Sequence, residues 1–228
     1  AFNAAFQEFG LPWHWDVELY VELLAVAGGK ERLTHYCRCV DPRRMMQADS
    51  AEFIARLHQR KTRIYERRVE MGEVPARPGV VRLIRELAEN DVRVAIATTT
   101  SRANVDVLLA TTLGDLPLDC FEVIGAGEQA AAKKPAPDIY HWVLARMGLE
   151  PGQCLAFEDS GNGIRASRAA GLPTVVTVND YTRDHDFSGA IAVLSDLGEP
   201  DAPFQVIRGE AAGRGWVDLP LLRAWHGA

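Results

Sequence analysis

Apolar residues in the first third of the chain recur at three- and four-residue intervals, the spacing of one face of a helix. Capping signals support this pattern, because Asp16 precedes the first apolar run, Gly28-Gly29 interrupts it, and Ser50 opens the longest run. The predicted helices span Val17–Ala27, Lys30–Val40 and Ser50–Met71. Residues 1–74 are therefore predicted to form an all-helical unit.

The pattern changes after Pro75, Pro78 and Gly79, where short β-branched runs begin to alternate with amphipathic stretches. Predicted strands cover Val92–Thr98, Phe121–Ile124, Cys154–Phe157 and Pro173–Val178, and predicted helices cover Val80–Asn90, Ser101–Leu113, Pro137–Met147 and Gly161–Ala170. Apolar strands separated by helices are typical of a parallel sheet covered on both faces. We therefore predict an α/β fold, with a doubly wound parallel sheet in residues 75–228 and a helical cap domain in residues 1–74.

Composition and charge narrow the class of protein. The 228 residues are 47% hydrophobic, which is enough for a large core, and the net charge of −6 comes without long runs of like charge. No apolar stretch is long enough to span a bilayer, and four cysteines in a chain of this size favour reduced thiols. Neither nucleic acid nor a membrane is an expected partner. We expect a monomeric cytoplasmic protein, or one of the plastid stroma if the source is a photosynthetic eukaryote.

Ligands of doubly wound sheets bind beyond the carboxyl ends of the strands, and three of these ends carry polar residues here. The first predicted strand ends in Thr98-Thr99-Thr100-Ser101, four hydroxyl groups that lead into a helix N-terminus. Such a terminus favours an anion, because its backbone N–H groups are free and its dipole end is positive. The alternative is that Ser101 only caps the helix.

The other two strand ends carry charged side chains. After the second strand, Pro135 holds Lys134 in an extended conformation, although Lys133-Lys134 is also consistent with a solvated surface pair. The third strand ends in Glu158-Asp159, and adjacent carboxylates of this kind suit magnesium. Alternatively, Asp159 caps the following helix and Glu158 faces solvent.

Hydroxyl groups, a fixed lysine and a carboxylate pair at one sheet edge are what a phosphoryl group in transfer requires. The segments that carry them resemble three motifs of the haloacid dehalogenase (HAD) superfamily of phosphotransferases, in the branch with a helical cap that includes β-phosphoglucomutase. These segments are Ala97-Thr98-Thr99-Thr100, Lys134-Pro135-Ala136-Pro137-Asp138-Ile139-Tyr140 and Leu155–Ile164.

The resemblance implies a Mg²⁺-dependent phosphatase that works through an aspartyl-phosphate intermediate. In such an enzyme Thr98 and Lys134 would be catalytic, the first as a hydrogen-bond donor to the phosphoryl group and the second as its neutralising cation. Glu158 and Asp159 would bind the Mg²⁺ cofactor. The implied substrate-binding positions in the core are Thr99, through its backbone N–H, and Thr100, Ser101, Arg102 and Asn104, of which Arg102 and Asn104 would contact a second, non-reacting phosphate.

In the cap, Gly28–Arg32 resembles the loop that meets the substrate in sugar-phosphate members of this branch. It contributes Gly29, Lys30 and Arg32 as substrate-binding candidates. Lys61 is another, although its neighbours are equally consistent with a solvated helix face. Within this branch, the chain most resembles members that remove one phosphate from a sugar bisphosphate. The implied small-molecule partner is the substrate xylulose-1,5-bisphosphate, a by-product of the Calvin cycle that inhibits Rubisco.

The family's first motif, Asp-x-Asp-Gly-Thr, does not occur in these 228 residues. Because Phe2, Phe6 and Phe9 share a helical face with no capping residue before them, we expect an upstream segment that carries this motif and the central strand of the sheet. Two other functions remain open. One is a β-phosphoglucomutase-like mutase, which shares the residues above, and the other is a non-catalytic phosphate-binding relic.

Overall fold

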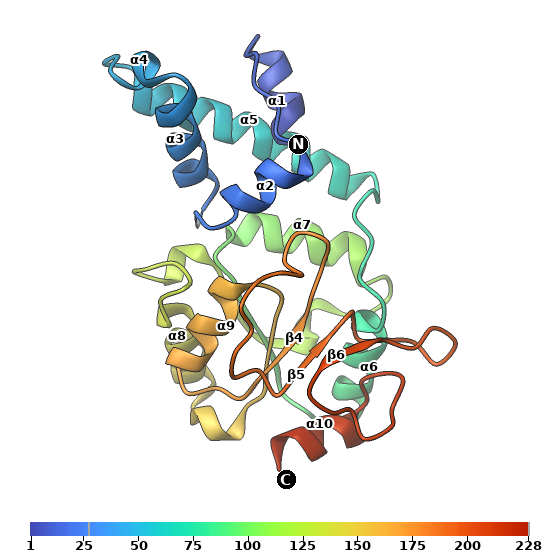
Figure 1. The fold of residues 1–228 in the computed structure, drawn as a ribbon. Coiled ribbons are helices and arrows are strands. Elements are labelled where there is room, and N and C mark those ends of the chain that lie inside the picture. Colours follow the sequence, from blue (N-terminus) through green and yellow to red (C-terminus); the bar gives the residue numbers. More distant parts are fainter. Residues whose placement is uncertain (27, 228) are drawn as a thin grey trace. The chain divides into compact units, whose positions relative to one another are not determined.

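The computed structural model describes residues 1–26 and 28–227, and the chain forms two compact units, Ala1–Val74 and Pro75–Ala228 (Figure 1). The helical unit contains α1 (Phe2–Glu8), α2 (Val17–Leu23), α3 (Gly29–Val40), α4 (Pro42–Met45) and α5 (Ser50–Glu70). Asp16 caps α2 as its sequence position predicts, since Oδ1 accepts a hydrogen bond of 2.9 Å from the Leu19 backbone N–H.

The helices of this unit pack around a core that includes Phe6, Leu33, Cys37 and Leu57, which are completely buried. Tryptophan and phenylalanine rings fill the space between α1 and the segment before α2. The ring centroids of Phe2 and Trp15, for example, lie 4.5 Å apart.

The Gly28-Gly29 pair separates α2 from α3 for two different reasons. Gly28 adopts a φ of 91°, in the region that favours glycine, and serves as the N-cap of α3. Gly29 lies against α5, where an added Cβ would come 2.5 Å from His58 Nε2. The predicted helix over Val17–Ala27 is too long, since α2 ends at Leu23 and Ala27 lies outside the described residues.

The second unit is an α/β domain. Its elements are α6 (Val80–Glu89), β1 (Val94–Ala97), α7 (Arg102–Thr112), η1 (Leu118–Cys120), β2 (Phe121–Gly125), η2 (Gly127–Gln129), α8 (Asp138–Met147), η3 (Pro151–Gln153), β3 (Ala156–Glu158), α9 (Gly161–Ala169), β4 (Thr174–Thr177), β5 (Ala192–Leu194), β6 (Val206–Arg208) and α10 (Leu219–His226). The α8 helix packs on β1 and β2, whereas α9 packs on β3 and β4. The predicted α/β class with a largely parallel sheet is confirmed.

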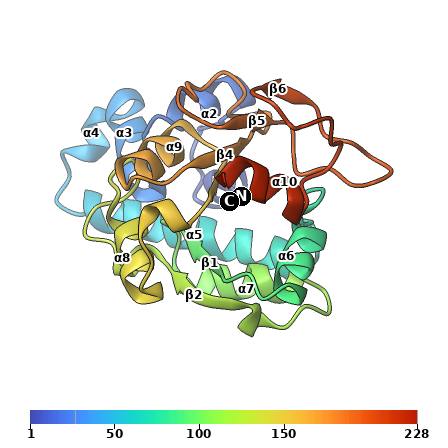
Figure 2. The same cartoon turned by 90° about the horizontal axis from the view of Figure 1, so that it is seen from below.

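The strands form two sheets. In one, β1 pairs in parallel with β2; in the other, β3, β4 and β5 are parallel and β6 runs antiparallel to β5. Seen from below, β1 and β2 lie on one side of the unit and β4, β5 and β6 on the other (Figure 2). β5, β6 and α10 were not predicted. The two strands have only three residues each, and β6 is exposed along its length, so neither gives a clear sequence pattern.

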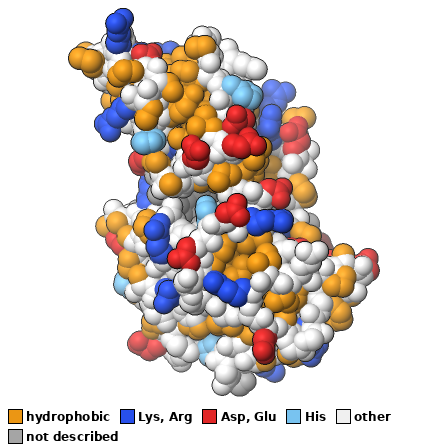
Figure 3. Space-filling view, viewed as in Figure 1, with side chains coloured by type: hydrophobic (Ala, Val, Ile, Leu, Met, Phe, Trp, Pro, Cys, Tyr) orange, Lys and Arg blue, Asp and Glu red, His pale blue; other side chains and the backbone are white. Residues whose placement is uncertain are grey.

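The larger sheet carries much of the hydrophobic core of this unit. Val175 and Leu194 are completely buried and pack with Val217 and Leu221 from the C-terminal segment. On the face that Figure 3 shows, basic and acidic side chains lie intermingled over the surface. Among the described residues, no helix has the length and apolar character needed to cross a bilayer.

Candidate active site

The chain after β1 is a tight polar turn. The backbone N–H of Thr98 continues the β1–β2 ladder by donating to Gly125 O, and the Thr98 hydroxyl oxygen accepts from the Thr100 N–H at 3.3 Å. Gly127 of η2 packs directly on this turn, because an added Cβ would lie 2.5 Å from Thr99 O. The first strand end is therefore held in a defined conformation by the end of the second.

The helix that follows begins with the polar residues singled out in the sequence. Ser101 caps α7, since its hydroxyl oxygen accepts from the Asn104 N–H at 3.4 Å, and Asn104 Nδ2 donates to Thr100 Oγ1 at 3.0 Å. The Arg102 guanidinium is exposed and forms an ion pair of 2.7 Å with Asp106 one turn later. Capping and anion binding are compatible here, because the Ser101 cap uses one N–H group of the helix terminus while the Arg102 N–H donates to the Glu128 carboxylate at 3.3 Å.

Lys134 is not a solvated surface lysine. Only 15% of its side chain is exposed, whereas its neighbour Lys133 is exposed. Its ammonium group donates to Ala97 O at the end of β1 at 2.9 Å and to Glu158 Oε1 at the end of β3 at 2.6 Å. The lysine thus joins the carboxyl ends of one strand from each sheet.

Glu158 and Asp159 have different surroundings. The Glu158 side chain is buried, and its Oε1 accepts from Lys134 and from the Tyr140 hydroxyl. Asp159 is exposed, and among the described residues its carboxylate has no hydrogen bond or ion pair. The suggestion that Asp159 caps the next helix is wrong, because Ser160 is the N-cap of α9 and its hydroxyl accepts from Gly163 N–H at 3.1 Å.

These two carboxylates fit a divalent cation. Each keeps at least one oxygen that no donor occupies within the described part of the chain, and a magnesium ion is typically held by one or two carboxylates, waters and substrate phosphate. No group of three His, Cys, Asp or Glu side chains among residues 1–26 and 28–227 is arranged to bind a metal alone. The described residues therefore supply carboxylate oxygens that could hold a divalent cation together with further ligands, but not a complete set of ligands.

Two residues of this cluster were missed in the sequence. Tyr140 is buried, and both burial and the neighbouring Glu158 carboxylate raise the pKa of its hydroxyl far above the ordinary value. Gly163 lies so close that an added Cβ would be 1.8 Å from Glu158 Oε2. The only sequence signal was their position inside the motif segments, six residues after Lys134 and five after Glu158.

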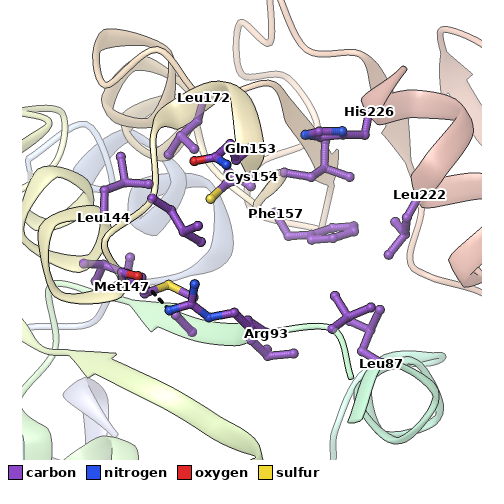
Figure 4. Close-up of a pocket in the computed structure, with 18 of the residues that line it drawn as sticks. Leu87, Arg93, Leu144, Met147, Gln153, Cys154, Phe157, Leu172, Leu222 and His226 are labelled. Carbon is purple, nitrogen blue, oxygen red and sulfur yellow. Dashed lines mark hydrogen bonds between the residues drawn. The ribbon is translucent and has the colours of Figure 1, made fainter. Parts of the chain in front are cut away.

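A cavity of about 590 Å³ separates β1 from β3. Its walls are mostly apolar and come from both strands and from α6, α8 and α10; the residues labelled in Figure 4 include Leu87, Leu144, Met147, Phe157, Leu172 and Leu222. Phe157 of β3 is unusually exposed for a strand residue of the interior, at 37%. The edges of β1 and β3 that face this cavity have no strand partner among the described residues.

The cap candidates lie in the helical unit and differ in their surroundings. The helix predicted over Lys30–Val40 is confirmed, because α3 begins at Gly29 and includes both Lys30 and Arg32; the loop that Gly28–Arg32 resembles is therefore not a loop at these two residues. Arg32 is buried, and its guanidinium donates to Leu23 O and Val26 O beyond the end of α2. Its role in this structure is to satisfy those carbonyl groups, whereas Lys30 is exposed.

Lys61 lies on α5, with its ammonium group 5.1 Å from the centre of the Phe2 ring and 5.2 Å from that of Tyr65. Burial and the positive charge of Arg32 lower the pKa of this lysine below its ordinary value. Lys61 is therefore not simply a solvated residue on the face of a helix, the alternative that the sequence left open.

Comparison of this chain with known proteins shows which family it belongs to. The sequence profile of the haloacid dehalogenase-like hydrolases matches residues 1–171 of the chain. The chain belongs to this family. It is also 53% identical over 226 residues to the plasmid-encoded protein CbbY of Cupriavidus necator, a match that covers 99% of this chain and 89% of that protein. CbbY of Rhodobacter capsulatus is 46% identical, with 86% of this chain and 85% of that protein covered.

Solved structures agree with this assignment. The structure of a CbbY mutant from Rhodobacter sphaeroides in complex with xylulose-(1,5)bisphosphate matches with a TM-score of 0.76 and 39% identity, covering 87% of this chain and 86% of that one. A β-phosphoglucomutase from Clostridium difficile shares the fold, with a TM-score of 0.65 at 18% identity over 84% of this chain and 82% of that one. The predicted resemblance and the prediction of a phosphatase enzyme of this family are confirmed.

Proposed function

We propose that the protein is a Mg²⁺-dependent phosphatase of a sugar bisphosphate, with xylulose-1,5-bisphosphate as substrate. The observation that carries the proposal is the pair of hydrogen bonds made by the Lys134 ammonium group, one to Ala97 O and one to Glu158 Oε1. Thr98 follows Ala97 in the chain, and Asp159 follows Glu158. A hydroxyl donor, a cation and two carboxylates are thereby gathered within one strand-end region. The substrate itself is proposed from the relatives, because a CbbY structure contains xylulose-(1,5)bisphosphate.

In this proposal each group has one task. The Thr98 hydroxyl donates to the transferring phosphoryl group, and Lys134 neutralises negative charge that builds up there. Asp159 and Glu158 would hold Mg²⁺, which supplies Lewis-acid polarisation of the phosphoryl oxygens when bound. Arg102 and Asn104, at the start of α7, are the candidates in the core for a second phosphate.

The aspartyl-phosphate intermediate requires the family's first motif, and the cavity between β1 and β3 supports a place for its strand. An extended apolar segment in this cavity would pair with two free strand edges and cover Phe157. The carboxyl end of this segment would then lie beside the carboxyl ends of β1 and β3, where the Lys134 ammonium group donates to both Ala97 and Glu158. The proposal therefore makes Lys134 the cation beside the aspartate nucleophile.

The decisive assay measures phosphate release by the full-length protein from xylulose-1,5-bisphosphate, with Mg²⁺ and with excess EDTA. We expect turnover only with Mg²⁺, and Asp159→Ala should abolish it while the circular dichroism spectrum stays that of a folded protein. Residues 1–228 alone should release no phosphate, since they lack the Asp-x-Asp-Gly-Thr motif.

The same assay distinguishes the alternatives. A mutase would convert the bisphosphate or a sugar monophosphate to an isomer without stoichiometric phosphate release. A phosphate-binding relic would bind the compound and release nothing. Full activity in excess EDTA would contradict the metal assignment.

A further inference from the structure

Tyr140 is the buried polar residue of the site to which the proposed function gives no task. It lies on α8, and its hydroxyl donates to Glu158 Oε1, the same oxygen that accepts from Lys134. The lysine ammonium group lies 4.8 Å from the centre of the Tyr140 ring and 3.4 Å from its hydroxyl oxygen. Tyr140 therefore contacts both charged partners of the ion pair.

The two oxygens of Glu158 consequently have unequal roles. Oε1 is occupied by two donors, whereas no donor among the described residues reaches Oε2. Oε2 instead lies in the space left by the missing side chain of Gly163, where a methyl group would be 1.8 Å from Oε2 and 2.2 Å from the carboxyl carbon. Moving the carboxylate away from Gly163 would break the bonds at Oε1.

We propose that Tyr140 is a positioning residue which, together with the space at Gly163, fixes the Glu158 carboxylate so that Oε2 stays available to a divalent cation. This inference rests on the proposed function, because it concerns the same metal site. Lys134 donates to the same oxygen, but its ammonium group is shared with Ala97 O, so Tyr140 is the donor whose only acceptor among the described residues is the Glu158 carboxylate. A phenol on a rigid, buried ring selects one oxygen.

Burial suits Tyr140 to this task. The Tyr140 ring is buried on α8, and its hydroxyl is directed at Glu158 Oε1, to which it donates. Outer-shell partners of this kind orient metal ligands, and their loss typically costs about 10- to 100-fold in metal affinity. A phenylalanine at this position would keep the ring beneath Lys134 and lose only the donor.

The first test uses Tyr140→Phe in the full-length protein, with Mg²⁺ affinity measured by isothermal titration calorimetry in the absence of substrate. We expect the Kd for Mg²⁺ to rise by about 10- to 100-fold, while kcat at saturating Mg²⁺ falls much less. Thr174→Val is the matched control, because it removes another buried hydroxyl of this unit, one that bonds Ser167 and Leu172. That control should lower the melting temperature and leave the Kd for Mg²⁺ unchanged.

The second test displaces the same carboxylate without touching Tyr140. Gly163→Ala should raise the Kd for Mg²⁺, because its methyl group would occupy the position of Oε2. Gly161→Ala, two residues earlier in α9, has only ordinary contacts of 3.6 Å or more to His185 and should leave the Kd unchanged. If Tyr140→Phe does not fold, the comparison of Gly163→Ala with Gly161→Ala tests whether the position of the Glu158 carboxylate controls Mg²⁺ affinity.

The outcomes separate the inference from the function on which it rests. Unchanged Mg²⁺ affinity in Tyr140→Phe, or equal affinity in the two glycine variants, overturns the positioning role. Absence of Mg²⁺ binding and of phosphatase activity in the wild-type protein would instead overturn the proposed function. A loss of affinity that follows the loss of melting temperature in all variants, Thr174→Val included, would show a merely structural effect and also overturn the inference.

Discussion

At the scale of single residues, adjacent side chains of the same type have different surroundings. Lys133 is exposed, whereas Lys134 is largely buried and makes hydrogen bonds to Ala97 and Glu158. In the same way Glu158 is buried, and the next residue, Asp159, is exposed. Such differences follow from where each backbone position lies relative to the strand ends, and for the lysine pair they make Lys134, not Lys133, the member that contacts the strand ends.

Replacing Lys134 tests this distinction. If its ammonium group stabilises the charge of phosphoryl transfer, Lys134→Ala should lower kcat by on the order of 10² to 10⁴, the range for loss of one preorganised charge. The measurement is steady-state phosphate release by the full-length protein. Lys133→Ala is the matched control and should retain activity; equal losses in the two variants would contradict the assignment.

At the scale of elements, the connection from the helical unit to α6 is tied to the larger sheet. The Arg77 guanidinium donates to Thr177 O and Thr177 Oγ1 at 3.2 and 3.0 Å, and to Ser195 O at 2.6 Å. These acceptors lie at or just beyond the carboxyl ends of β4 and β5. A single side chain thus satisfies carbonyl groups that the strands leave unpaired where they end.

Replacing Arg77 should therefore destabilise the α/β unit more than replacing a partly exposed residue usually does. We expect Arg77→Ala to lower the free energy of unfolding of the α/β unit by about 2–3 kcal/mol, because several charge-assisted hydrogen bonds are lost together. Urea unfolding followed by fluorescence measures the change. Arg85→Ala removes an exposed ion pair with Asp115 and should cost less than about 1 kcal/mol; similar costs for both variants would contradict this account.

At the scale of the whole molecule, the candidates for a second phosphate belong to both units. Lys30 is in the helical unit, and Arg102 is in the α/β unit, where it forms an ion pair with Asp106. Arg102 can exchange this exposed carboxylate for a phosphate, since surface ion pairs contribute little stability. Arg32 is a poorer candidate because its donors are committed to carbonyl groups.

Substrate comparison tests the second phosphate. Lys30→Ala or Arg102→Ala in the full-length protein should lower kcat/KM for xylulose-1,5-bisphosphate far more than for p-nitrophenyl phosphate, which has only the reacting group. Arg146→Ala, an exposed arginine of α8, should affect neither substrate. A uniform loss on both substrates would argue against a distal phosphate site.

The sequence by itself determined the α/β class, most helix and strand positions, and the motif segments that contain Thr98, Lys134 and Glu158. It could do so because these features are local: apolar periodicity, capping residues such as Asp16, and polar residues at strand ends. The short strands β5 and β6 lack a periodic signal of useful length, so only their pairing with β4 and with each other revealed them.

Only the tertiary structure decided which atoms meet. That Arg32 satisfies carbonyl groups of its own unit, that Lys134 joins the ends of β1 and β3, and that Tyr140 and Gly163 enclose the Glu158 carboxylate depend on contacts between residues distant in sequence. A residue type states what a side chain can bind; the packing around it fixes which partner it has, because a buried polar group must be satisfied by whatever the fold brings near.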